Sequence, residues 1–251
     1  NNTIRQWSPQ LSTSRVVISV AFDVISMACA YGVVLVGGLA GKYVYKRLDD
    51  DKHHFGMTMQ NSNCTTNHLD ITDGPNGDLI ALISSNDRKT RFLNLDTTTI
   101  TNTLTFPFPV NCSALSPDKK LLCVVGDSTQ TLIADPNTGD GKSNENFDYS
   151  FACCWHPNGR TFATGNQDMT TRIYDIRNPC KAMYVLGGRV GGIQSLRFSH
   201  DGKFLAAAEP IDYVHLYDTD TYDSCQTINL FGSVHSLQKT RLYSLPMQTA
   251  T

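Results

Sequence analysis

The sequence predicts an all-β fold in which one small antiparallel sheet is repeated along the chain. Three observations support this prediction. A segment plan recurs with a nearly constant period, Asn-Gly or Asp-Gly turns separate its apolar runs, and 40% of the 251 residues are hydrophobic. With a formal net charge of −2, this composition is typical of a globular protein that buries a large core. We expect residues 1–251 to form a single domain.

The clearest copy of the repeat runs from Phe151 to Asn178. It reads FACCWHPNGRTFATGNQDMTTRIYDIRN, in which a first strand leads through a Pro-Asn-Gly turn into a second strand. A tight turn at Asn166–Asp168 then leads into a third strand that ends at Asp175. The copy from Ile193 to Asp220 repeats this plan, with Asp201-Gly202 at its first turn. Such turns need positive φ angles, which Asn, Asp and Gly adopt at little cost.

Earlier copies keep the same plan with weaker matches. Third strands are expected to end near residues 8, 46, 94, 135, 175 and 218, at intervals of 38, 48, 41, 40 and 43 residues. In the copy that ends at residue 94, Asp87 occupies the turn position of Asp168, and residues 225–251 would form a degenerate last unit. Because a lone sheet cannot cover both of its apolar faces, such sheets pack around an axis as the blades of a β-propeller.

The apolar stretch Val16–Leu39 is long enough to resemble a membrane span, but we interpret it as strands. Asp23 near its middle would cost about 2.5–3.5 kcal/mol in a bilayer on insertion scales. The stretch is rich in valine and isoleucine, and Tyr31-Gly32 offers a turn between two strands. No basic segment with a cleavage site precedes it, as a secretory signal would require. We expect no membrane partner.

The segment GNQDMTTRIYD resembles the WD40-repeat family, in which a tight-turn Asp is followed by a strand that ends in Trp-Asp. The resemblance covers nearly the whole chain and is strongest over residues 109–220. The amino-acid sequence of the repeats is similar to that of poorly characterised fungal and plant WD-repeat proteins. The resemblance implies a seven-bladed propeller in which one or more blades are incomplete. It also implies either that the termini share a blade or that segments are missing at the ends.

The sequence departs from the family pattern, because it contains no Trp-Asp and no Gly-His dipeptide. The family joins a His, a Ser or Thr, the turn Asp and the Trp in a hydrogen-bonded chain. By resemblance, Thr164, Asp168 and Tyr174 occupy three of those places. The loop Gly187–Gly192 stands where the His would be, so we expect Asp168 to accept hydrogen bonds from turn N–H groups instead.

Motifs of catalysis and cofactor binding are not found, so we expect neither an enzyme nor a cofactor. The chain contains no G-x-S-x-G, H-E-x-x-H or G-x-G-x-x-G. Gly141-Lys142-Ser143 resembles the end of a phosphate-binding loop, but Pro136 replaces its leading glycine, and we interpret the segment as a charged loop. One alternative stays open, namely that the propeller is an enzyme or binds a small molecule in its central channel. Such a site would need acids or histidines at corresponding positions of successive blades. The first strands instead begin with Asn111, Tyr149 and Gly192.

Metal and nucleic-acid sites are not expected either. Asp49–His54 combines carboxylates with two imidazoles, which are metal ligands, but adjacent side chains of an extended segment point apart, and we interpret it as an exposed insertion between blades. No C-x-x-C pair suggests zinc. Lysine and arginine are spread thinly, with the densest pairs at 46–47 and 119–120, which argues against a nucleic-acid partner.

We therefore expect a non-catalytic scaffold whose loops bind other proteins. Two loops are candidates for partner contacts. Phe106 and Phe108 in the loop 105–109 would anchor a partner if exposed, whereas the alternative is that both rings pack inward. The glycine-rich loop 187–192 is the second candidate.

A sharper alternative comes from QDMTTRIYDIR, which resembles the box by which some WD40 proteins dock, as substrate receptors, onto the propeller adaptor of a cullin-type ubiquitin ligase. The resemblance implies that Asp168, Asp175 and Arg177 contact the adaptor, with the Arg177 guanidinium making bidentate contacts. Tyr174 in place of Trp departs from the box. Single cysteines in apolar runs behave as buried hydrophobes, which indicates a reducing compartment, the cytoplasm or the nucleus.

Overall fold

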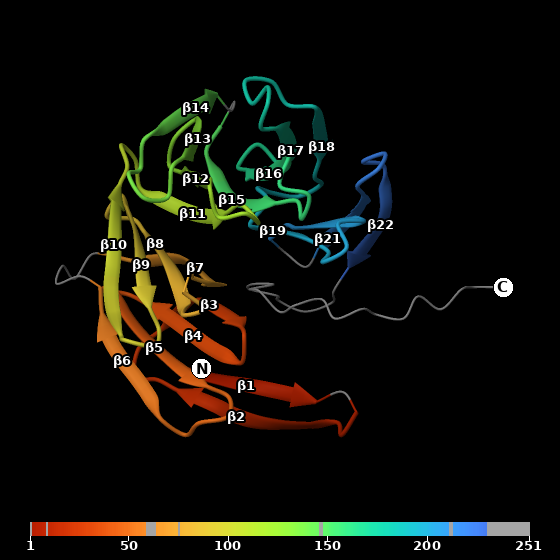
Figure 1. Ribbon diagram of the computed structural model, residues 1–251. Coiled ribbons are helices and arrows are strands. Elements are labelled where there is room, and N and C mark those ends of the chain that lie inside the picture. The colour runs from red at the N-terminus through yellow and green to blue at the C-terminus, as the bar shows by residue number, and fades with distance from the viewer. Residues whose placement is uncertain are drawn as a thin grey trace.

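The computed structural model describes residues 2–8, 10–58, 64–74, 76–145, 148–210 and 213–229, which form strands in six antiparallel sheets (Figure 1). The first sheet is a hairpin of β1 (Thr3–Ser8) and β2 (Thr13–Ser19), here called the N-terminal hairpin. Five four-stranded sheets follow it in chain order, and we call them blades 1 to 5.

The strands of each blade are adjacent in sequence and in space. In blade 1 they are β3 (Val24–Ala30), β4 (Val33–Gly38), β5 (Lys42–Arg47) and β6 (His53–Met57). In blade 2 they are β7 (Thr66–Asp73), β8 (Leu79–Ser85), β9 (Lys89–Asn94) and β10 (Thr99–Thr105). In blade 3 they are β11 (Val110–Leu115), β12 (Leu122–Gly126), β13 (Gln130–Ala134) and β14 (Gly141–Glu145). In blade 4 they are β15 (Ser150–Trp155), β16 (Thr161–Asn166), β17 (Thr170–Asp175) and β18 (Tyr184–Gly187). In blade 5 they are β19 (Ser195–Phe198), β20 (Phe204–Ala208), β21 (Tyr213–Asp218) and β22 (Ser224–Asn229).

The sheets pack face to face around a common centre, with the first strand of each blade innermost (Figure 1). Among the described residues, one cluster of buried apolar side chains fills the space between each pair of neighbouring sheets. From the N-terminal hairpin to blade 5, these clusters include Ile18 with Val34, Leu35 with Ile83, Leu82 with Val124, Val125 with Tyr174, and Ile173 with Leu205.

The apolar runs of the middle strands follow from this packing. Leu82 and Ile83 are neighbours in β8, yet Leu82 faces blade 3 and Ile83 faces blade 1. Because successive side chains of a strand point to opposite faces, a strand covered on both faces is apolar throughout. The outermost strands lie at the periphery, and β10 (TITNTLT) is correspondingly polar and mostly exposed.

Turn chemistry fixes the hairpin between the first and second strands. Gly77, Gly159 and Gly202 all have positive φ, at 80°, 68° and 76°, in the region that glycine enters without steric penalty. In blade 4, the Asn158 side chain accepts a hydrogen bond from the Arg160 N–H at 2.8 Å. Asp201 accepts the corresponding bond from the Lys203 N–H in blade 5. The same asparagine or aspartate plus glycine therefore closes the same turn in successive blades.

The all-β propeller fold is as expected, but the blade count differs from seven. The described residues form five four-stranded blades and one two-stranded sheet. Residues 225–229 belong to β22, the outermost strand of blade 5, and not to a further unit. The rest of the expected last unit, residues 230–251, and with it the question of ring closure, lies outside the described residues.

The stretch Val16–Leu39 forms strands as expected, whereas two exposed segments differ from their sequence interpretation. The stretch Val16–Leu39 contains parts of three strands, with a turn at Tyr31-Gly32 between β3 and β4. No helix in the described ranges has the length and apolar character needed to cross a membrane. Gly141–Ser143 lies in β14, and His53 and His54 begin β6, so both segments are outermost strands and not loops. An outermost strand is exposed, and therefore it lacks the apolar pattern that identifies a strand.

Candidate functional site

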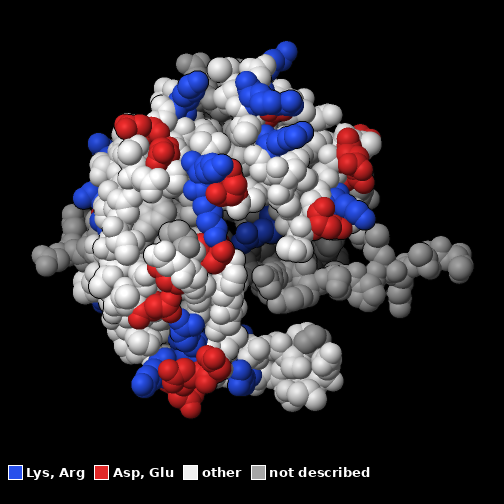
Figure 2. Space-filling model, in the orientation of Figure 1, with Lys and Arg blue, Asp and Glu red and all other residues white. Residues whose placement is uncertain are grey.

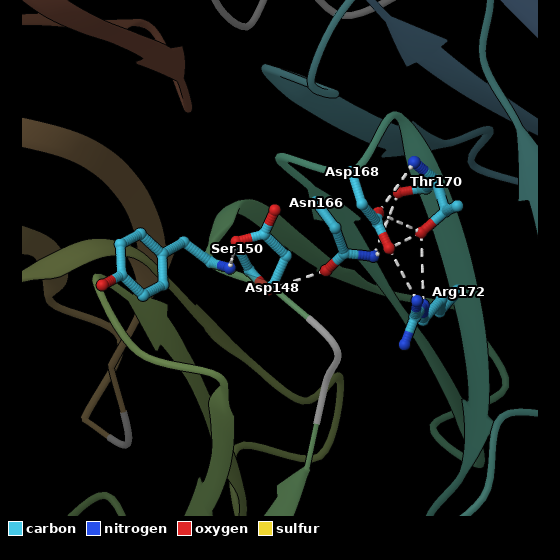
Figure 3. A network of polar contacts seen from close by, with 7 residues as sticks. Asp148, Ser150, Asn166, Asp168, Thr170 and Arg172 are labelled. Carbon is cyan, nitrogen blue, oxygen red and sulfur yellow. Dashed lines mark hydrogen bonds and ion pairs between the residues drawn. The ribbon is translucent and has the colours of Figure 1, made fainter.

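Asp168 is the centre of a polar network at the turn between β16 and β17 of blade 4 (Figure 3). Its Oδ1 accepts hydrogen bonds from the Thr170 backbone N–H at 3.1 Å and from the Thr170 hydroxyl. Its Oδ2 accepts a bond at 2.7 Å from the guanidinium of Arg172, whose side chain is almost fully buried. Asp168 therefore satisfies a turn N–H group and also neutralises a buried cation.

Blade 2 repeats the pairing of a turn aspartate with a buried arginine. Asp87 lies at the corresponding turn between β8 and β9, and Arg91 on β9 binds both of its carboxylate oxygens, Oδ1 at 3.1 Å. In each blade the arginine follows the aspartate by four residues. These arginine partners were not predicted from the sequence, although the spacing D-x-x-x-R is present in both copies of the repeat.

The remaining members of the expected network are buried on adjacent strands. Thr164 on β16 lies opposite Arg172 on β17 in the ladder. Tyr174 on β17 is buried, and its ring stacks on that of Phe162 with 5.2 Å between the centroids. Burial raises the pKa of Tyr174 above its ordinary value. Tyr174 thus contributes apolar packing between blades 3 and 4.

Asn166 extends this network toward the first strand of blade 4. Its side-chain amide donates to the Thr170 carbonyl at 3.0 Å, and its Oδ1 accepts a bond from the Ser150 hydroxyl at 2.7 Å (Figure 3). The turn is thereby tied to both the innermost strand and the third strand. The polar groups of this network are thus directed at one another.

Asp175 and Arg177 form a separate pair at the opposite end of blade 4, after β17. The Arg177 side-chain Nε donates to both Asp175 carboxylate oxygens, at 2.9 and 3.1 Å, and the Arg177 backbone N–H donates to Oδ1 at 2.8 Å. These bonds lower the pKa of Asp175 to about 2, with the Arg177 side chain as the largest cause. The Arg177 side chain is 74% exposed and that of Asp175 is 13% exposed, so the arginine is held in place on the surface.

The positions of Phe106 and Phe108 require a correction. Both rings are buried in the cluster between blades 2 and 3, together with Leu82 and Val124. The segment after β10 turns inward to reach β11, and it carries both rings into the interface between the two blades. The alternative of inward packing therefore describes the structure, and these rings are not available to a partner.

The loop Gly187–Gly192 is held by the Glu209 carboxylate, which was not predicted as a site residue from the sequence. Glu209, which follows β20, accepts hydrogen bonds from the backbone N–H groups of Arg189 at 2.7 Å, Val190 at 2.6 Å and Gly191 at 3.2 Å. On its other side, Glu209 contacts the His215 Nε2 at 2.6 Å. Burial alone would raise the pKa of Glu209. The hydrogen bonds together lower this pKa by more than burial raises it, so the net shift is downward.

The central channel has a volume of about 1280 Å³ and is lined mainly by the innermost strands. Side chains tie these strands together: the Ser26 hydroxyl donates to the Thr66 carbonyl, Asn67 to that of Val110, and Asn111 to that of Ser150. Each donor lies at or next to a β-bulge at the start of an innermost strand. The residue just after the bulge is Ser26 in blade 1, His68 in blade 2, Cys112 in blade 3 and Ala152 in blade 4. Ser195 occupies the matching position in blade 5. The channel therefore presents no repeated acid or histidine in the described blades.

Positive and negative side chains are interspersed over the face shown in Figure 2. Asp51 pairs with Lys46 at 3.1 Å, and the His54 ring stacks on that of Tyr45. No group of three or more His, Cys, Asp or Glu side chains in the described ranges is arranged to hold a metal ion.

Comparison with known proteins agrees with this geometry. Residues 148–175, which cover most of blade 4 from β15 to β17, match the family model described as WD domain, G-beta repeat. A protein of the fission yeast Schizosaccharomyces pombe, described as uncharacterised, is 24% identical over 237 residues. The match covers 88% of this chain and 67% of the yeast protein.

Proposed function

Because this chain is a WD40-repeat β-propeller, we propose that it acts as a non-catalytic scaffold that binds other proteins. The observation that carries the proposal is the contrast between the channel and the ends of the blades. The channel lacks a repeated set of reactive side chains, whereas the turns and connections are rigidly held and expose apolar and charged groups. Loops on a rigid framework are common sites of protein recognition.

Cross-linking with mass spectrometry on the full chain in its native cell tests this proposal. We expect cross-links from the loops at one or both ends of the blades to one or more specific proteins. A chain that forms no protein contacts but binds a small molecule in the channel would overturn the scaffold proposal, and it would favour the channel alternative.

A second candidate is a substrate receptor that docks onto the propeller adaptor of a cullin-type ubiquitin ligase. The observation that favours it is Arg177, whose guanidinium is exposed yet fixed by Asp175. A fixed arginine loses less conformational entropy when it binds a partner. We expect Arg177→Ala to reduce adaptor co-purification, with Arg160→Ala at the same end of blade 4 as the control. Unchanged co-purification of the Arg177→Ala variant would remove this candidate.

We further propose that the scaffold works in the cytoplasm or the nucleus. Support comes from the cysteines whose side chains are described, all of which are free thiols. Several of them, including Cys112 and Cys153, are buried in apolar surroundings, where burial raises the thiol pKa well above its ordinary value. Such thiols stay protonated and unreactive, as in proteins of reducing compartments. Fluorescence microscopy of the tagged chain at its native expression level tests this placement, and a secreted chain would contradict it.

A further inference from the structure

We propose that blades 4 and 5 carry a preformed binding surface for an acidic and apolar segment of a partner protein. This inference rests on the scaffold function proposed above and specifies where and what the scaffold binds. The surface, here called the blade 4–5 rim, consists of Tyr149, Met169, Arg189 and Val190. These side chains lie at the end of the propeller where the innermost strands begin, and Tyr149, Met169 and Val190 are 45%, 42% and 44% exposed.

Backbone hydrogen bonds hold the three segments of the rim together. The Gln167 N–H donates to the Tyr149 carbonyl at 2.8 Å, which joins the start of blade 4 to its second turn. The Gly188 N–H donates to the Met169 carbonyl at 2.6 Å, and the Ile193 N–H donates to the Asn166 carbonyl at 3.0 Å. The loop between blades 4 and 5 is thus fastened to that turn at both of its ends.

Glu209 fixes the tip of this loop from below. Its carboxylate is fully buried and receives three consecutive backbone N–H groups, those of Arg189, Val190 and Gly191. His215 contacts the same carboxylate, and the other ring nitrogen of His215 lies 3.2 Å from the Thr227 hydroxyl. A loop held in this way is already ordered, so binding does not incur the entropy loss of ordering it.

Charge identifies the partner's chemistry. The carboxylate of Asp168 is directed at Thr170 and Arg172 (Figure 3), and that of Glu209 is occupied by the loop itself. By contrast, Arg189 uses its backbone N–H, and its guanidinium has no hydrogen bond or ion pair within the described part of the chain. The rim therefore combines an exposed arginine, which has no ion pair among the described residues, with aromatic, thioether and branched apolar side chains. A carboxylate flanked by apolar residues complements both features.

The experiment replaces Tyr149 with the photo-cross-linker p-benzoylphenylalanine in the full chain, expressed in its native cell. Tyr31, at the other end of the blades and 50% exposed, receives the same replacement as a matched control. Cross-linked peptides are sequenced by mass spectrometry. We expect the peptides captured at position 149 to contain an acidic residue within a few positions of an apolar one, and to differ from those captured at position 31.

Charge variants test the role of Arg189 in the same assay. Arg189→Glu and Val190→Asp should each reduce the cross-link yield at position 149 by about tenfold, and Arg189→Lys should retain most of it. Arg88, an exposed arginine on the second turn of blade 2 at the same end of the propeller, is the matched control, so Arg88→Glu should leave the yield unchanged. Circular dichroism verifies that each variant is folded.

Two outcomes separate failure of the rim from failure of the scaffold. If position 31 or other loops capture specific proteins while position 149 does not, or if Arg189→Glu keeps the wild-type yield, the rim proposal is wrong and the scaffold proposal stands. If no surface position captures a specific protein, both proposals fail. Captured peptides without acidic residues would also overturn the inference.

Discussion

Buried Asp–Arg pairs recur in this protein at turns that the repeat marks only by their aspartate. Asp168 and Arg172 in blade 4, and Asp87 and Arg91 in blade 2, each place a guanidinium between sheets and neutralise it with a turn carboxylate. The arginine side chain is nearly buried near the start of the third strand, and its guanidinium binds the turn carboxylate. A single side-chain pair thereby connects turn geometry to packing between blades.

Removal of the Asp168 carboxylate should destabilise the fold through its partner. In the Asp168→Ala variant, the buried Arg172 guanidinium would lose its counterion, and we expect the free energy of unfolding to fall by about 2–4 kcal/mol. Urea denaturation followed by the fluorescence of buried Trp155 measures this loss. Asp201→Ala, which removes an exposed carboxylate, should cost much less, because solvent screens its interactions. A loss no larger for Asp168→Ala than for Asp201→Ala would contradict the structural role of the pair.

Asp175 should contribute a pH-dependent term to stability. Arg177 lowers the folded-state pKa of Asp175 to about 2 from an ordinary value of 3.8. Because the folded pKa lies below the unfolded one, this contribution is present above about pH 4 and disappears as the pH falls toward 2. NMR titration of the Asp175 carboxyl carbon should show the low pKa in the native chain and a higher one in Arg177→Ala. Arg160→Ala should shift the pKa much less, and equal pKa values in the native chain and Arg177→Ala would disprove the assignment.

At the scale of single elements, position within the blade decides what a sequence pattern reveals. Middle strands such as β8 and β12 are covered on both faces and carry runs of apolar residues. The turns of blades 4 and 5 carry Asn-Gly and Asp-Gly at fixed places. Both signals are local, and for this reason the all-β propeller could be predicted from the sequence.

The sequence carries no recognisable pattern where a strand faces solvent, or where two contacting residues are far apart in the chain. The outermost strands β6 and β14 read as loops because exposure removes their apolar pattern. Phe106 and Phe108 alternate with prolines, and this pattern does not specify on which side of the connection the rings lie. Glu209 lies about 20 residues from the loop it holds, and no local pattern connects the two. The turn aspartates were therefore predicted without their arginine partners, and the loop 187–192 was predicted without the glutamate that holds it.

The connection from β10 to β11 should behave as part of the core. Truncation of Phe106 to alanine would leave a cavity between blades 2 and 3, and we expect the free energy of unfolding to fall by about 3–5 kcal/mol. Phe106→Leu should cost less, because it retains most of the buried volume. Denaturant titration compares the two variants. At a temperature where Phe106→Ala is folded, it should form the same cross-links to partner proteins as the native chain. If cross-links were lost while stability stayed unchanged, Phe106 would instead be a partner-contact residue.

The whole molecule is a linear series of sheets in which each sheet packs against its neighbours in the chain. Clusters between sheets and the hydrogen bonds from Ser26, Asn67 and Asn111 join successive innermost strands. Stability in such an array depends on the number of neighbours that cover each sheet. Blades 1 to 4 are covered on both faces among the described residues, whereas the N-terminal hairpin has blade 1 on one face.

Hydrogen exchange should therefore vary along the array. The N-terminal hairpin has two strands, and its outward face exposes Trp7 and Val16, so its amide groups should exchange through local opening that costs less free energy than global unfolding. The middle strands β12 and β16 have sheets on both sides and should exchange slowest. Mass spectrometry of peptides from 2–19, 122–134 and 161–175 resolves this order. Uniform protection across the three peptides would instead show that the array opens as one cooperative unit, with the exposed face of the hairpin covered in solution.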